Sequence, residues 1–160
     1  MSMIQCLVAF LGRALLSIIF ISAAINKLLD WGGTLQYFNQ TLSDRLAMSI
    51  GIGYMQELAE WGIAHASTLL LVGILFELIG GLLVFLGIAT RLGAVLLIIF
   101  LIPTTFLFHH FWDLQGMDRQ MQLTNFMKNL SILGGLLYLL AMGRGKRCPP
   151  KKSEPKPAAP

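Results

Sequence analysis

The sequence predicts an all-α polytopic membrane protein built as an antiparallel four-helix transmembrane bundle. Its 160 residues suffice for one domain. Of these residues 56% are hydrophobic and 12% are charged, whereas a soluble globular chain carries about 25% charged residues. The mean hydropathy is +0.71. Residues 67–86 form an apolar run with a single acid, Glu77, and match the roughly 20 residues that a helix needs to cross a hydrocarbon core of about 30 Å.

The first predicted span covers residues 4–25 and contains one charge, Arg13. No Lys or Arg precedes Arg13 and no small-residue cleavage site follows the apolar run, so we expect a retained helix rather than a signal peptide. Trp31 is typical of the membrane surface. The adjacent Gly32 and Gly33 predict a turn where the chain leaves the membrane.

Residues 34–60 carry too many charges to cross a membrane. We expect this segment to lie along the interface as an amphipathic element. Gly51 and Gly53 would interrupt any helix there, because glycine disfavours helix interiors. The charged residues of the segment are Asp44, Arg45, Glu57 and Glu60.

Three further spans follow this segment. They are predicted at residues 67–86, 92–108 and 126–142, with a polar loop over residues 113–124 before the last. Only residues 87–91 separate the second span from the third, so these two spans must be antiparallel neighbours. Pro103 lies inside the third span and is expected to kink it.

The chain ends in a basic segment rich in Pro and Lys. We divide the sequence into a four-helix membrane domain at residues 1–143 and a disordered cytoplasmic tail at residues 144–160. Four spans place both termini on one side, which holds Arg13, Arg91 and the six basic residues of the tail, against four basic residues opposite. Because the cytoplasmic segments of membrane proteins are enriched in Lys and Arg, we expect both termini on the cytoplasmic side of a bacterial inner or plasma membrane. The tail holds much of the net charge of +4, which indicates contact with membrane lipid rather than nucleic acid.

Glu77 lies near the middle of the second predicted span, where an unpaired charge is costly. Gly73 and Gly81 flank it at a spacing of four, so the acid lies on a small-residue face that another helix can approach closely. Arg13 is the predicted partner, because its long side chain can reach along the first helix. We expect a buried pair of Arg13 and Glu77, and the sequence leaves open whether the pair is structural or functional.

A polar pocket is predicted at the outer ends of the spans. One stripe of the first helix, at a spacing of 4-3-4-3, contains Arg13, Ser17, Phe20, Ala24 and Lys27. Stacking this stripe against the outer ends of the third and fourth spans predicts a basic pocket above Glu77, suited to an amphipathic anion or a quinone headgroup. The residues of this pocket are Asn26, Lys27, His109, Lys128 and Asn129.

The sequence offers no set of catalytic residues. No nucleophile–base pair, phosphate loop or metal cluster can be assembled from its motifs. His109 and His110 are adjacent and point to different faces, which argues against a shared metal ion. The two cysteines have no nearby histidine and do not make a zinc site. We therefore expect no metal and no evident cofactor, with a quinone as the candidate ligand.

Four stretches resemble the DoxX family of small four-helix membrane proteins: ISAAINKLLDW, FELIGGLLVFLGIATRLGA, PTTFLFHHFWD and FMKNLSILGGLLYLLA. The second is the most specific, with its Glu, paired Gly and Gly-x-x-Thr-Arg end. The resemblance implies a four-helix bundle that accompanies redox partners, since the family's namesake looks like the small membrane subunit of a thiosulfate:quinone oxidoreductase. The Pro/Lys-rich tail and the long segment after the first span depart from the family pattern. The recurring polar positions of the family fall on Arg13, Lys27, Glu77, Arg91, His109 and Asn129.

These observations lead to one expected function and two alternatives. We expect an integral membrane accessory subunit, associated with a quinone- or thiol-linked redox system and without chemistry of its own. The first alternative is a small dimeric transporter that uses Glu77, which a carboxylate titrating near neutral pH would favour. The second is an enzyme that acts on a quinone in the outer pocket. The expected partners are membrane lipid, a redox enzyme and a second copy of the chain.

Overall fold

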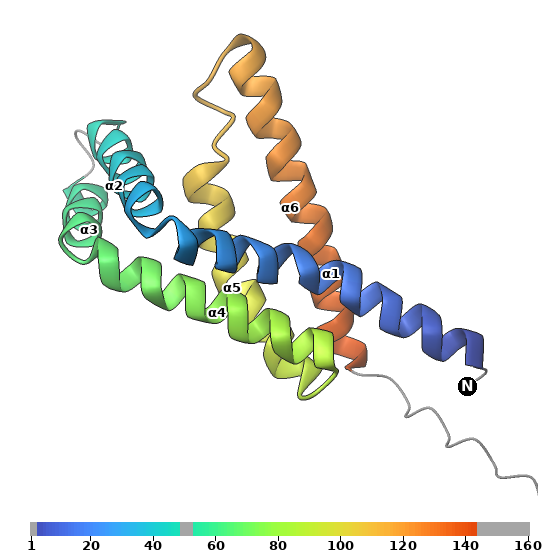
Figure 1. The fold of residues 1–160 in the computed structure, drawn as a ribbon. Helices are drawn as coiled ribbons and strands as arrows, with labels where there is room; N and C mark the ends of the chain where they lie inside the picture. The colour runs from blue at the N-terminus through green and yellow to red at the C-terminus, as the bar shows by residue number, and fades with distance from the viewer. Residues whose placement is uncertain (1–2, 49–52, 144–160) are drawn as a thin grey trace, which may run out of the picture.

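Six α-helices make up the part of the chain that the computed structural model describes, residues 3–48 and 53–143 without the side chains of 46–48 and 53–55. This part contains no strand, which confirms the all-α class. The predicted tail at residues 144–160 lies outside the described residues. The helices are α1 (Met3–Leu29), α2 (Trp31–Met48), α3 (Gly53–Ala64), α4 (Ala66–Leu86), α5 (Thr90–Phe108) and α6 (Gly116–Met142), as drawn in Figure 1.

Four of these helices, α1, α4, α5 and α6, are long and apolar enough to cross a membrane. They contain the four predicted spans and confirm a polytopic membrane protein. The bounds differ at α6, which begins at Gly116, so the loop predicted at residues 113–124 is largely helical. Asp118 in the first turn suits the positive end of the helix dipole, and the Met, Arg and Gln residues around it are good helix formers.

The turn predicted at Gly32 and Gly33 is wrong, because both glycines lie inside α2. The chain turns at Asp30, the single residue between α1 and α2. The Asp30 carboxylate accepts a hydrogen bond of 3.1 Å from the Gly33 N–H and thereby caps the start of α2. A Cβ on Gly33 would overlap this carboxylate, so glycine leaves the space that the cap needs.

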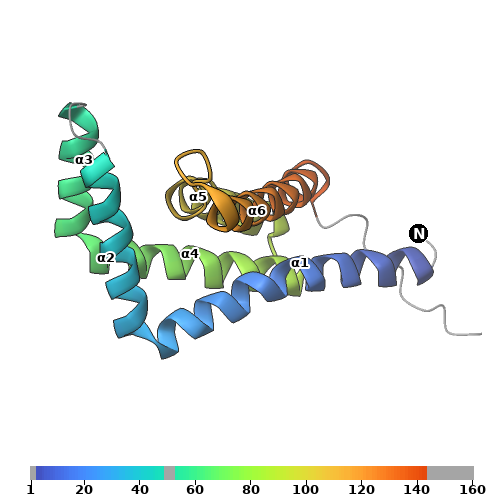
Figure 2. The same cartoon turned by 90° about the horizontal axis from the view of Figure 1, so that it is seen from above.

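Helices α2 and α3 pack against each other at one end of the molecule. Figure 2 shows them running across the direction of α1 and α4. Leu42 and Ala59 are buried, and a Leu42 methyl lies 3.5 Å from the position of a Cβ on Gly62. Gly53 is the first residue of α3 and does not interrupt it, whereas Gly51 lies outside the described residues.

Among the four spans, α4 packs against both α1 and α5, and α6 packs against α5 (Figures 1 and 2). The start of α1 and the end of α6 lie at one end of the bundle, opposite α2 and α3. As predicted from their short connection, α4 and α5 are neighbours. Their backbones meet at Gly80 and Gly93, where a Cβ on Gly93 would lie only 2.8 Å from the Gly80 carbonyl oxygen.

The core lies where all four spans meet. Phe20 of α1, Val84 of α4, Leu97 and Leu101 of α5 and Leu136 of α6 form its buried centre. On α1, the buried residues are Ser17, Phe20 and Ala24, which belong to the stripe that the sequence predicts. Much of the apolar surface of α1 and α6 is exposed, as expected for helices that contact lipid.

The turn between α4 and α5 depends on a glycine with a left-handed backbone. Gly87 has φ 70° and ψ 22°, and its N–H and that of Ile88 donate to the carbonyls of Val84 and Leu83. This pair of bonds satisfies the end of α4 in a Schellman motif.

We expect Gly87→Ala to lower the free energy of unfolding by about 1 kcal/mol, because a Cβ disfavours this conformation. Thermal unfolding in detergent, with Gly134→Ala as a control in open space, measures the difference.

Candidate functional site

The central polar contact of the bundle is an ion pair between α1 and α4. Lys27 Nζ donates to Glu77 Oε2 at 2.6 Å. The Glu77 side chain is 4% exposed and that of Lys27 is 29% exposed. Because a carboxylate in the middle of a span needs a cation or a proton, this pair explains how Glu77 is accommodated.

The position of Lys27 follows from the direction of side chains on a helix. Cα–Cβ bonds lean toward the N-terminus of a helix, so Lys27 reaches inward from the outer end of α1 toward Glu77. Its ammonium also lies over the ring of Phe100, 5.4 Å from the ring centroid. Phe100 fits against Gly73, one turn before Glu77, where a Cβ would lie 3.5 Å from the ring. Three helices thus surround the ammonium.

The predicted pair of Arg13 and Glu77 is wrong, because Glu77 pairs with Lys27 instead. The register of α1 on α4 gives the reason. Phe20 and Ile21 lie against Gly81, one turn beyond Glu77. Arg13 lies a further seven residues along α1, or about 10 Å past this level, in the direction away from Glu77. The helix stripe was predicted correctly, but the partner lies at its opposite end.

A second polar contact joins α5 to α6. Asn129 Nδ2 donates to Thr105 Oγ1 at 3.0 Å, and the Thr105 hydroxyl donates to the Leu101 carbonyl at 2.6 Å. Thr105 is buried. Hydrogen bonds of this kind fix the packing of helices in lipid. Asn129 was predicted as a pocket residue, and the structure gives it this contact between helices.

The five residues of the predicted pocket lie in separate surroundings. Lys27 is held by Glu77, Asn129 by Thr105, and His109 Nδ1 lies 2.9 Å from Gln122 Oε1. Asn26 and Lys128 are exposed. Within residues 3–48 and 53–143, no hydrogen bond or ion pair joins any two of the five to each other. The stripe on α1 predicted that Lys27 points inward, but spacing alone did not predict which polar groups meet.

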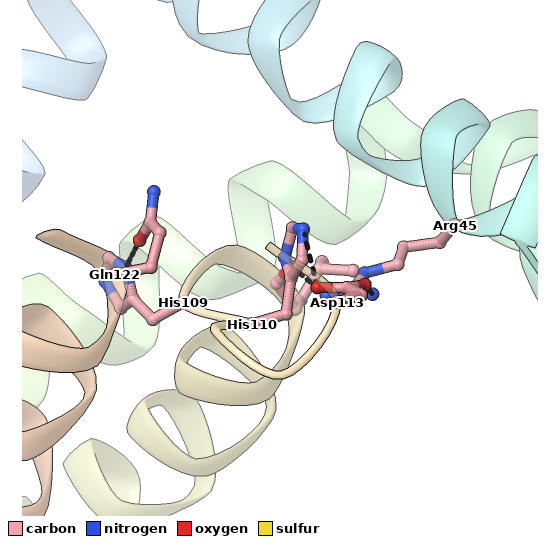
Figure 3. A network of polar contacts seen from close by, with 6 residues as sticks. Arg45, His109, His110, Asp113 and Gln122 are labelled. Carbon is pink, nitrogen blue, oxygen red and sulfur yellow. Dashed lines mark hydrogen bonds and ion pairs between the residues drawn. The ribbon is translucent and has the colours of Figure 1, made fainter. Parts of the chain in front are cut away.

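A network that the sequence did not predict ties α2 to the segment after α5. Arg45 Nη1 donates to Asp113 Oδ2 at 3.1 Å, and His110 Nε2 lies 3.7 Å from the other oxygen of Asp113 (Figure 3). The Arg45 guanidinium carbon Cζ also lies 5.9 Å from the centroid of the Trp112 ring. The opposite charges of residues 45 and 113 were visible in the sequence, but their separation of 68 residues gave no signal of contact. The network fixes α2 across the outer end of α5.

The chemistry of the site is that of a charge pair beside an aromatic ring. The ammonium of Lys27 has three N–H donors, one of which serves Glu77. Among the described residues, no three of His, Cys, Asp or Glu come together in a way that could hold a metal ion. The two remaining N–H groups of Lys27 are the donors that the site offers to a polar group beside Phe100.

Comparison with known proteins identifies a family and two relatives. Residues 8–110 match the family described as DoxX. Inner membrane protein YphA of Escherichia coli (strain K12) is 28% identical over 135 residues, which cover 84% of this chain and 82% of the relative. Inner membrane protein YqjF of the same strain is 34% identical over 134 residues, with the same coverage of both chains. No solved structure matches this chain.

Proposed function

The chain belongs to the DoxX family of integral inner membrane proteins, and from this premise we propose that it is an accessory subunit of a quinone- or thiol-linked redox system. In this role it carries out no chemistry of its own. It holds a lipid-soluble redox partner, or the membrane anchor of a redox enzyme, at the level of Lys27. The family match and the two relatives support the location, and the site supports the ligand class.

The observation that carries the proposal is a partly exposed Lys27 side chain whose ammonium pairs with a buried carboxylate. Lys27 stays 29% exposed although Glu77 is almost fully buried. A quinone headgroup is flat and carries carbonyl acceptors, so it suits the remaining N–H donors of Lys27 and the ring of Phe100. The ion pair also gives the bundle a polar group without net charge.

The orientation forms part of the proposal. We place both termini and the basic tail in the cytoplasm, where Arg13, Arg91 and the six basic residues of the tail outnumber the four on the other side. The tail then contacts anionic lipid. The outer end, with α2 and α3, faces the periplasm.

Quinone capture tests the function. Tagged protein is extracted from native membranes in polymer nanodiscs, and bound isoprenoid quinones and proteins are identified by mass spectrometry. We expect a quinone and a redox enzyme to copurify. Phe100→Leu removes the ring but retains the ion pair, and we expect this variant to lose most of the quinone. Phe106→Leu is the matched control, because Phe106 lies on the same helix but contacts Trp112 and Phe126 instead.

Transport is the alternative function, and an uptake experiment distinguishes it from the accessory role. A small dimeric transporter would use Glu77 as its proton-coupled acid. The pairing of Glu77 with Lys27 argues against a carboxylate that is free to cycle. Proton-driven uptake of a lipophilic cation into proteoliposomes, abolished by Glu77→Gln, would favour transport. Absence of both quinone and redox enzyme from the purified protein would refute the accessory role.

A further inference from the structure

The outer face of α3 presents an apolar and aromatic stripe. Leu58 is 62% exposed and Trp61 is 52% exposed, and His65 follows at the end of the helix. The spacing of three and then four residues places them on one side of the helix. The Trp61 and His65 rings stack with centroids 4.7 Å apart, which makes a flat aromatic surface. The opposite side of α3, with Ala59 and Gly62, packs against α2.

The stripe continues into the lipid-facing side of α4. The same alternation of three and four residues leads from His65 through Thr68 to Val72, Leu75 and Ile79, all of which are exposed. α4 is long and apolar enough to cross a membrane, so we expect lipid against these exposed residues. Only His65 separates α3 from α4, and backbone hydrogen bonds run through this joint from His65 to Trp61 and from Leu69 to His65. The exposed side of α3 therefore adjoins a surface that contacts lipid.

Short connections hold α2 and α3 close to the ends of the membrane spans. At the other end of the pair, Asp30 alone separates α1 from α2. Arg45 binds α2 to Asp113 beyond the end of α5. Because a single residue joins α1 to α2 and another joins α3 to α4, α2 and α3 stay close to the C-terminus of α1 and the N-terminus of α4. They run across those spans, which is the direction of the membrane surface (Figure 2).

We propose that α3 lies in the lipid–water interface, with the side chains of Leu58 and Trp61 among phospholipid headgroups and the upper acyl chains. Tryptophan prefers this layer because its ring is apolar and its N–H donates a hydrogen bond. The other exposed flank is polar, since Gln56 donates to Glu60 at 3.2 Å, and it faces water. The occupant of the stripe is phospholipid rather than protein. This inference is independent of the proposed redox role.

Depth-dependent quenching of fluorescence tests the proposal. The variant Trp31→Phe/Trp112→Phe retains Trp61 as the single tryptophan. In phosphatidylcholine vesicles we expect quenching by lipid brominated near the headgroup to exceed quenching by lipid brominated near the chain end. We also expect weak quenching by aqueous acrylamide. The matched control adds Glu60→Trp to a chain without other tryptophans, and this residue should respond to acrylamide and not to lipid.

Two outcomes would overturn the proposal. In the first, Trp61 behaves like the Glu60→Trp control and responds only to acrylamide. In the second, neither quencher reaches Trp61 and chemical cross-linking joins two copies through α3, so that protein covers the stripe. A photoreactive leucine analogue at position 58 of the otherwise unchanged chain gives an independent measurement, because it labels phospholipid if the proposal is correct.

Discussion

Replacing Lys27 by methionine is expected to lower the free energy of unfolding in mild detergent by about 3 kcal/mol, since loss of one partner strands a buried charge. The stranded group is Glu77, whose side chain is 4% exposed. Glu77→Met should cost less, because Lys27 is 29% exposed and its flexible stem can turn toward the membrane surface. Unfolding by increasing proportions of a denaturing detergent, followed by circular dichroism, measures both losses.

The double variant Lys27→Met/Glu77→Met separates pairing from other effects. Two apolar side chains leave no charge in the bundle, so we expect the double variant to regain most of the stability lost by Lys27→Met. Lys128→Met is the control, since Lys128 lies exposed on α6. Equal stability of Lys27→Met and the wild type would show that the ion pair contributes nothing. A double variant as unstable as the sum of the single variants would argue against coupling.

Gly93→Ala is expected to produce the second large loss, about 1–3 kcal/mol, because the added methyl overpacks the contact between α4 and α5. The new Cβ would lie 2.8 Å from the Gly80 carbonyl oxygen and 2.9 Å from Leu83 Cβ. These atoms belong to backbone or lie next to it, so the strain is relieved only if the helices move apart. Small residues at such crossings let membrane helices approach closely.

Gly134→Ala provides the matched comparison for this prediction. It makes the same change inside a membrane-spanning helix, where nothing lies within 4 Å of the new Cβ. Alanine favours helix more than glycine, so we expect the control to equal or slightly exceed the wild type in thermal stability. If Gly93→Ala also matched the wild type, the close approach of α4 and α5 would carry no energetic weight.

The spans could be predicted from the sequence because lipid imposes a simple rule on it. A helix that crosses the membrane must be apolar for about 20 residues, and each of the four spans meets this rule over most of its length. The buried stripe of α1 could also be predicted, since Ser17, Phe20 and Ala24 follow helical spacing. The prediction of a turn at Gly32 and Gly33 failed because the Asp30 cap outweighs the low helix propensity of these two glycines.

The site could be predicted only in part. The sequence identified Glu77 as the group that needs a cation, but two cations lay on the same stripe of α1. Choosing Lys27 over Arg13 requires the register of α1 on α4, and this register is set by the fit of Phe20 and Ile21 against Gly81. The N-terminal lean of helical side chains was the available signal for Lys27. The contact of Arg45 with Asp113 joins distant segments and had no local signal.

The separation of 50 residues between Lys27 and Glu77 has a consequence for how the protein is made. At a synthesis rate of about 5–20 residues per second, α1 waits roughly 3–10 s in the membrane before the acid emerges from the ribosome. During this interval we expect the lysine to extend outward to the headgroups, because long basic side chains place their charge in water. We expect the arrival of α4 to turn the lysine toward Glu77, so that the same side chain first holds α1 at the headgroups and then holds it against α4.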